Sequence, residues 1–259
     1  SNVRGTGQPC QPAAFAPGHR RLAVAAGINR FPRLLAEGLP LRTKCRVTNL
    51  SVVPGGIAAQ DEEGQLHGAR SVVLALALEQ TARLLGTLPE TRETAAILAL
   101  LKLFTSVPCL TAIAAYPSGT PWPPWDISYP EDSRILLLAS NESSKRPVPS
   151  CEGPVLVYQG FPAWSHAHLT DPPEDWSALL LQEAARLFGR WAGAPEWVHN
   201  HRWSYARLDQ ANELEGPLLF QSEGAGIGLA GDLFHRGGGI QAAWLSGDDL
   251  ASRLRKMSR

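Results

Sequence analysis

A glycine-rich segment near the end of the chain, GIGLAGDLFHRGGGIQAAWLSG (residues 226–247), restricts most strongly how this chain can fold. Its first six residues match the pattern GxGxxG, which in dinucleotide-binding proteins opens a helix inside a βαβ unit of about 30 residues. Here DLFHRGGG follows the pattern, and too few residues remain for such a unit. We therefore interpret the segment as a strand that ends at Gly231 and Asp232, a glycine loop, and then a helix.

The residue types of this segment leave two interpretations open. A carboxylate at a strand end accepts hydrogen bonds from sugar hydroxyls, and glycines let the backbone approach a flat ring or a phosphate. The first amides of a helix carry partial positive charge and suit an electron-rich acceptor. In the other interpretation, the loop is a surface turn and Asp232 is only a cap.

Composition limits the classes of partner and compartment. Hydrophobic residues make up 44% of the 259 residues, enough for a sizeable core in one large domain or two small ones. Lysine plus arginine and aspartate plus glutamate number 24 each, so we expect no nucleic-acid partner and no acidic membrane surface. No apolar run reaches the ~18 residues of a membrane span, and we expect no signal peptide.

The cysteines and histidines give no metal signature by their spacing. The four cysteines form no CxxC, which predicts no metal site and is typical of a reducing, cytoplasmic compartment. The motifs HAH (166–168) and HNH (199–201) would place two imidazoles on one face of a strand. Because no cysteine or carboxylate joins them at ligand spacing, hydrogen-bonded surface histidines are favoured over a zinc site.

Turn residues and hydrophobic patterning predict a mixed chain of helices and strands. Turns at 54–56 and 62–64 predict an antiparallel meander of three strands. Its last strand, SVVLALA (71–77), is continuously apolar, as in strands buried on both faces. Further elements are expected as a helix over most of 79–101, strands near 106–117, 134–140 and 154–161, a helix near 170–193, a strand at 199–208, a hairpin turning at Glu223-Gly224, and a helix from about Gln241.

Five segments, taken in order, resemble the renalase-like family of FAD-dependent oxidoreductases, which is related to the flavin amine oxidases. They are AAGINRFPRLLAEGLPLRTKCRVTNL, GARSVVLALALEQTARLL, PAWSHAHL, HRWSYARL and GLAGDLFHRGGGIQAAWLSG. The resemblance implies an α/β (mixed α+β) fold of two domains. A discontinuous FAD-binding domain would comprise residues 1–95 and 214–259, and an antiparallel-sheet substrate domain would comprise residues 96–213.

The same resemblance implies hydride transfer from a small reduced substrate, an amine or a dihydronicotinamide, to FAD, with oxygen as acceptor. Asp232, after Gly231, would contact the ribityl or diphosphate part of FAD, and the backbone at Val47 would lie near the adenine. Trp203 and Tyr205 are candidates to line a pocket for a flat substrate, with ordinary packing as the alternative. The backbone amides that would face the pyrimidine edge of the flavin are those of Gln241, Ala242 and Ala243.

The opening strand, GxGxxG turn and first helix of that family, which hold the ADP half of FAD, have no counterpart in this sequence. The chain is then a fragment, one half of a split flavoprotein, or a protein that lost FAD and serves as a binding or interaction protein. The sequence leaves open which of these holds, and so whether the chain is an enzyme. Without that strand, we expect residues 71–77 to be exposed and FAD to bind weakly. We also expect the chain to be a homo-oligomer or to pair with a complementary chain.

Overall fold

The computed structural model describes residues 2–4, 8–9, 23–24, 27–145, 153–208 and 214–257, and Cys10 and Cys151 lie outside this part. The chain forms two compact units. Unit 1 comprises Ser1–Leu41 and Pro108–Ala206, and unit 2 comprises Arg42–Val107 and Arg207–Arg259. These divisions differ from the predicted domains, because Ser1–Leu41 belongs to unit 1 and not with the rest of residues 1–95. The later divisions also fall beyond 95/96 and before 213/214, within two long strands described below.

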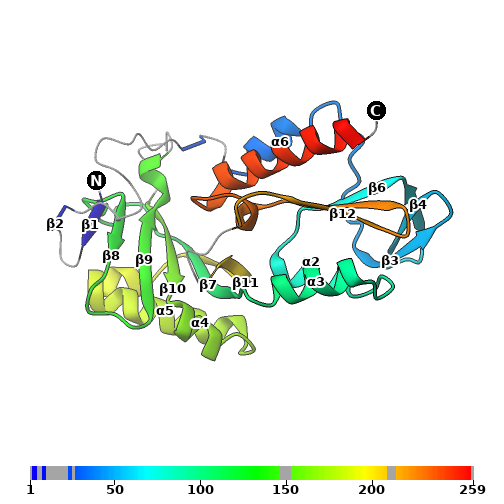
Figure 1. Ribbon diagram of the computed structural model, residues 1–259. Coiled ribbons are helices and arrows are strands. Elements are labelled where there is room, and N and C mark those ends of the chain that lie inside the picture. The colour runs from blue at the N-terminus through cyan, green and yellow to red at the C-terminus, as the bar shows by residue number, and fades with distance from the viewer. Residues whose placement is uncertain are drawn as a thin grey trace. The chain divides into compact units, whose positions relative to one another are not determined.

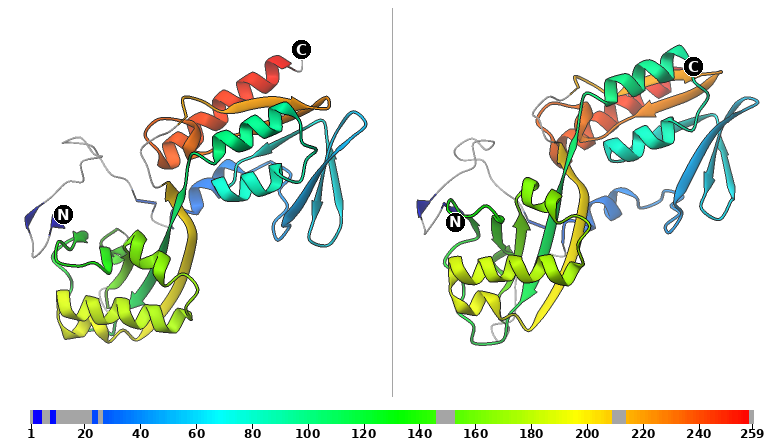
Figure 2. Two further views of the ribbon diagram at one scale, coloured as in Figure 1. Left: turned by 60° about the horizontal axis from the view of Figure 1, so that its bottom comes forward. Right: turned by 90° about the horizontal axis from the view of Figure 1, so that it is seen from below.

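Unit 1 contains a seven-stranded, largely antiparallel sheet in the order β11-β7-β10-β9-β8-β1-β2. Figure 2 shows the two helices α4 and α5 lying together on one side of this sheet. The strands are β1 (Asn2–Arg4), β2 (Gln8–Pro9), β7 (Ser106–Ala115), β8 (Ile127–Tyr129), β9 (Leu136–Asn141), β10 (Val155–Gly160) and β11 (Trp197–Leu208). The helices are α1 (Arg30–Leu35), η1 (Glu142–Lys145), α4 (Pro162–Ala167), α5 (Pro173–Phe188) and η2 (Arg190–Gly193).

The core of unit 1 is built from alternate residues of a strand and from every fourth residue of a helix. Alternate residues of β7, beginning with Leu110 and Ala112, are fully buried, as expected for one face of a strand. On α5, Trp176, Leu180 and Ala184 recur every fourth residue and pack against the same cluster. The helix predicted near residues 170–193 is therefore present as α5.

The interpretation of the HAH motif as part of a strand was wrong. Residues 162–167 form helix α4, and His168 follows as its last half-turn. Pro162 occupies the first turn, where its fixed backbone angle favours a helix and its missing N–H costs nothing. The His168 Nδ1 atom lies 2.7 Å from Asp171 Oδ2, so this histidine has a local hydrogen-bond partner.

Unit 2 contains two three-stranded sheets, in the orders β3-β4-β5 and β12-β13-β6. In Figure 1, α6 lies on one side of the β12–β13 hairpin and α2 and α3 lie on the other side. The strands are β3 (Val47–Val53), β4 (Gly56–Asp61), β5 (Leu66–Ala69), β6 (Ser71–Leu74), β12 (Leu218–Ser222) and β13 (Ala225–Leu229). The helices are α2 (Leu78–Leu85), α3 (Arg92–Leu101), η3 (Asp232–Phe234) and α6 (Gly239–Met257).

The predicted antiparallel meander is confirmed as β3-β4-β5, but its last strand was assigned wrongly. The chain leaves the meander at Arg70, and β6 instead pairs in parallel with β13. Strand β6 is also not buried on both faces, because the side chain of Val73 is 44% exposed. Among the described residues, β13 is the only strand next to β6 in its sheet, and Leu76 just beyond it is 43% exposed.

The described part of the chain contains no helix whose length and apolar character would let it cross a membrane.

A buried carboxylate ties α5 to the loop before β9. Ser133 Oγ donates a hydrogen bond of 2.6 Å to Glu183, and Arg186 donates two more, of 2.7 and 2.8 Å, in a bidentate arrangement. Arg186 first, and Ser133 after it, hold the pKa of Glu183 below its usual value, although burial acts in the opposite direction. This network therefore stabilises unit 1 when Glu183 is ionised.

We expect Glu183→Gln to lower the free energy of unfolding at pH 7 by about 1–2 kcal/mol, because Arg186 loses its charged partner. A lowered pKa in the folded state gives stability that is present above the unfolded pKa and is lost as pH falls through the folded pKa. The difference between wild type and variant should therefore shrink below about pH 4. Urea denaturation at pH 7 and below about pH 4 measures the difference in free energy of unfolding between the wild type and Glu183→Gln. Glu196→Gln, at an exposed position, is the control. A difference that does not change with pH would contradict this role.

Candidate functional site

The sequence GIGLAG lies along a buried strand and not at the start of a helix. Strand β13 pairs with β12 on one side and with β6 on the other. A Cβ atom on Gly226 would lie 2.5 Å from the Oγ of Ser71, and one on Gly228 would lie 2.9 Å from Leu250. Tight packing therefore accounts for these two glycines, and the structure agrees with our rejection of a nucleotide-binding loop at this point.

The end of β13 is held by one buried hydroxyl group from α6. Ser246 Oγ accepts a 2.9 Å hydrogen bond from the N–H of Gly231 and lies 2.8 Å from the carbonyl oxygen of Gly231, to which it can donate. Ser246 is fully buried. Gly231 has φ 149° and ψ −173°, a backbone conformation that is essentially limited to glycine. The turn from strand to loop therefore has a single, fixed geometry.

Asp232 follows this turn with its side chain exposed. Gly231 occupies the N-cap position of η3, so the carboxylate of Asp232 does not serve as the cap. The next two residues, Leu233 and Phe234, are each 4% exposed and anchor the short helix in the core of unit 2. The structure thus presents a carboxylate to solvent from a firmly anchored backbone.

Three consecutive glycines connect η3 to α6. Gly237, Gly238 and Gly239 have φ values of 96°, 58° and 69°, which L-residues with side chains rarely adopt. A Cβ atom on Gly237 or Gly239 would have no neighbouring atom within 4 Å. The backbone of this loop is therefore open to close approach by a ligand.

Helix α6 begins at Gly239, two residues before the predicted start near Gln241, so the amide of Gln241 lies in its first turn while those of Ala242 and Ala243 bond within the helix. The first N–H groups of a helix lack partners within the helix and carry partial positive charge. Gln241 and Ala243 are exposed, whereas the side chain of Ala242 is 1% exposed and packs inward. Ile240 and Trp244, four residues apart, are 55% and 52% exposed. A flat ligand with an electron-rich edge and an apolar body fits this combination.

The other predicted site residues lie elsewhere. Val47 starts β3, in the β3-β4-β5 sheet of unit 2. Its partly buried side chain packs against the hydrophobic cluster that contains Leu229 and Leu233. Trp203 and Tyr205 lie on β11 within unit 1, with side chains 51% and 39% exposed. They are therefore not core residues, and the packing interpretation does not account for them.

Strand β11 carries more exposed rings than the sequence analysis selected. Trp197 and His199 are stacked, with ring centroids 5.9 Å apart and planes inclined by 11°. The rings of His201 and Trp203 have centroids 4.1 Å apart. With Tyr205, these five residues alternate along one face of an edge strand, and we call them the aromatic stripe. Their period of two was visible in the sequence and could have identified the whole set.

Comparison with known proteins assigns the chain to a family. Residues 11–255 match the family model described as flavin containing amine oxidoreductase. A candidate protoporphyrinogen oxidase from Exiguobacterium sp. 255-15 has a TM-score of 0.67 at 16% identity, over 90% of this chain and 51% of that chain. Wild-type putrescine oxidase bound to putrescine has a TM-score of 0.63 at 14% identity, over 90% and 53% of the two chains.

Cyclohexylamine oxidase from Brevibacterium oxydans IH-35A has a TM-score of 0.56 at 13% identity, over 82% of this chain and 48% of that chain. At such identities the likeness shows a shared fold. The prediction of a mixed α/β flavin-oxidoreductase fold with antiparallel sheets is therefore confirmed. The chain spans about half the length of each of these three structures.

We expect Ser246→Ala to destabilise unit 2 by about 1–3 kcal/mol, because the partly buried N–H of Gly231 loses the hydroxyl oxygen that accepts its hydrogen bond. Ser252→Ala, at a partly exposed position of the same helix, is the control and should change stability by less than about 0.5 kcal/mol. Chemical denaturation measures both variants. Equal stabilities would show that Ser246 does not hold the strand end.

Proposed function

The chain belongs to the family of flavin containing amine oxidoreductases, and we propose that it forms the flavin-facing part of an FAD-dependent oxidoreductase. The proposal depends most on the run from Gly231 to the start of α6. There an exposed carboxylate, an open glycine backbone and a helix N-terminus come together within a few residues. Each of these groups suits a different part of a flavin cofactor.

FAD, when bound, would accept a hydride from the reduced substrate. The chain's own residues bind and orient it. Asp232, on the anchored η3 turn, would contact the ribityl or diphosphate part, where its carboxylate can accept hydrogen bonds from ribityl hydroxyls. The backbone amide of Gln241, in the first turn of α6, would face the pyrimidine edge and favour negative charge there, whereas the predicted amides of Ala242 and Ala243 already bond within the helix, which begins at Gly239.

A further segment would hold the ADP half of the cofactor, with the backbone at Val47 near the adenine. The only GxGxxG match in the 259 residues lies in β13, which is buried between two strands. Strand β6 has one strand neighbour among the described residues, and Val73 exposes 44% of its surface. A segment with a GxGxxG turn, in the same polypeptide or in a second one, could add a strand at this edge. A second copy of the chain could also cover it, giving a homo-oligomer.

The substrate would be a small reduced molecule, a dihydronicotinamide as in renalase-like proteins or an amine, with oxygen as the final acceptor. The aromatic stripe supports a flat substrate. Trp203 and Tyr205 offer exposed ring faces, and stacking on such a face contributes about 0.5–1.5 kcal/mol beyond area burial. These two residues are our candidates to stack on the ring of the substrate.

We expect Asp232→Ala to weaken FAD binding by roughly ten- to a hundredfold, because a charge-assisted hydrogen bond contributes about 1.5–3 kcal/mol. Asp248→Ala removes an exposed carboxylate on the nearby helix α6 and should leave the affinity unchanged. Titration of FAD, followed by quenching of its fluorescence, gives the dissociation constants of the wild type and both variants.

A different result would assign Asp232 to the turn alone. In that case Asp232→Ala would bind FAD as the wild type does and would lose about 1 kcal/mol of stability. The proposed contact to the ribityl or diphosphate part would then be wrong. Thermal unfolding of the same three proteins without FAD separates this outcome from a loss of binding caused by misfolding.

A further inference from the structure

Three chemically different side chains converge at one end of the meander in unit 2. Cys45 precedes β3, Asp61 ends β4, and His67 lies on β5. Their sulfur, carboxylate oxygen and imidazole nitrogen atoms all lie within 4.8 Å of one another. The proposed flavin-facing residues of this unit do not include any of the three.

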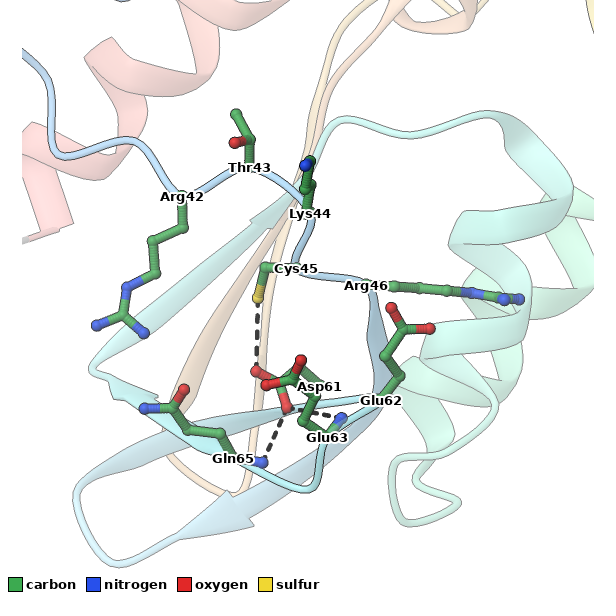
Figure 3. A pocket seen from close by; sticks show the side chains of 9 residues that line it. All are labelled: Arg42, Thr43, Lys44, Cys45, Arg46, Asp61, Glu62, Glu63 and Gln65. Carbon is green, nitrogen blue, oxygen red and sulfur yellow. Dashed lines mark hydrogen bonds between the residues drawn. The ribbon is translucent and has the colours of Figure 1, made fainter.

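The carboxylate of Asp61 is fixed before any ligand arrives. Its Oδ1 atom accepts hydrogen bonds from the backbone N–H groups of Glu63 at 3.1 Å and Gln65 at 2.8 Å. The residue is 6% exposed. Its second oxygen, Oδ2, therefore has a defined direction, toward His67 and Cys45. Figure 3 shows the Cys45 sulfur atom directed toward the Asp61 carboxylate.

The separations between the three atoms match a tetrahedral metal site. Cys45 Sγ lies 3.6 Å from Asp61 Oδ2 and 3.7 Å from His67 Nε2, and His67 Nε2 lies 2.9 Å from Asp61 Oδ2. Usual zinc bond lengths and tetrahedral angles require about 3.6 Å between sulfur and either other atom, and about 3.4 Å between nitrogen and oxygen. Only the distance between His67 Nε2 and Asp61 Oδ2 must increase, by about 0.5 Å, when a metal ion replaces the hydrogen atom between them.

The arrangement does not suit a nucleophilic cysteine. In a catalytic triad the nucleophile and the carboxylate contact opposite nitrogens of the imidazole, but here both lie nearest to Nε2 of His67. Burial, and then the neighbouring Asp61 carboxylate, raise the pKa of the Cys45 thiol, which disfavours a free thiolate. A divalent cation would instead favour the thiolate, and the thiol proton would leave to solvent.

We propose that Cys45, Asp61 and His67 bind one zinc ion, with the fourth position open to the adjoining cavity. This cavity has a volume of about 260 Å³ and is lined by Cys45, Asp61 and neighbouring charged residues. The ion would tie the segment before β3 to the β4–β5 hairpin. A single zinc-bound water would complete the coordination.

Arg42 is the group that opposes the ion. Its Nη1 atom lies 3.2 Å from Nδ1 of His67 and donates to it, which leaves the imidazole proton on Nε2. Zinc binding at Nε2 moves that proton to Nδ1, so the guanidinium must turn away. The side chain of Arg42 is exposed and has room to rotate. Arg42→Ala should therefore bind zinc several-fold more tightly than the wild type.

The experiment uses the full chain with zinc alone, and cobalt as a spectroscopic substitute. Competition with a chromophoric chelator should show one zinc per chain, and cobalt should give a thiolate-to-metal absorption band. Removing a group that only orients a metal ligand lowers metal affinity by about 10–100-fold. Cys45 and His67 would bind the ion directly, so Cys45→Ser and His67→Gln should each lower the zinc affinity by more than about 100-fold. Asp61→Asn keeps the oxygen that accepts from Glu63 and Gln65 and should weaken binding without unfolding the hairpin.

Cys109→Ser, at the other cysteine among the described residues, is the matched control and should bind zinc as the wild type does. Saturating zinc should also raise the unfolding temperature of the wild type and of this control by several degrees, but not that of Cys45→Ser. Circular dichroism without metal verifies that each variant is folded. The proposal is overturned if the wild type binds zinc no more tightly than Cys45→Ser, or if the thiolate band persists in Cys45→Ser.

Discussion

The parallel pairing of β6 with β13 is the constraint on which the candidate site depends. It joins Ser71–Leu74 to Gly226–Leu229, two segments separated by most of the chain. The pairing is possible because Gly226 and Gly228 have no side chains to collide with Ser71 and Leu250. Once this strand is placed, Ser246 fixes its end, and Asp232 and the glycine loop follow in a defined geometry. A substitution that displaces β13 would therefore disturb Asp232 and the glycine loop, which we assign to the cofactor.

Features set by neighbouring residues could be predicted from the sequence. The hairpin at Glu223-Gly224 has φ values of 49° and 87°, which is the turn chemistry that the sequence indicates. The three-stranded meander, the glycine loop and the helix after it were predicted for the same reason. Each depends on residues a few positions apart, whose backbone preferences act whatever the rest of the chain does.

Features set by distant residues could not be predicted. An apolar run such as 71–77 identifies a strand but not its partner, so β6 was assigned to the meander although it pairs with β13. Cys45, Asp61 and His67 match no ligand motif by spacing, and the register of the meander alone brings them together. Ser246 has no local signal either, since nothing near it in the sequence marks it as the partner of Gly231.

The two proposed sites of unit 2 have different roles, since the zinc site would fix the meander and the glycine loop would hold the flavin. The central claim concerns the flavin. It is tested most directly by the visible spectrum and elution volume of the purified chain, alone and mixed with a segment that carries a GxGxxG turn, each with FAD. We expect the mixture to elute as one yellow complex and the chain alone to retain little flavin. A mixture that stays colourless would contradict the claim, and a yellow monomer would contradict the need for a further segment.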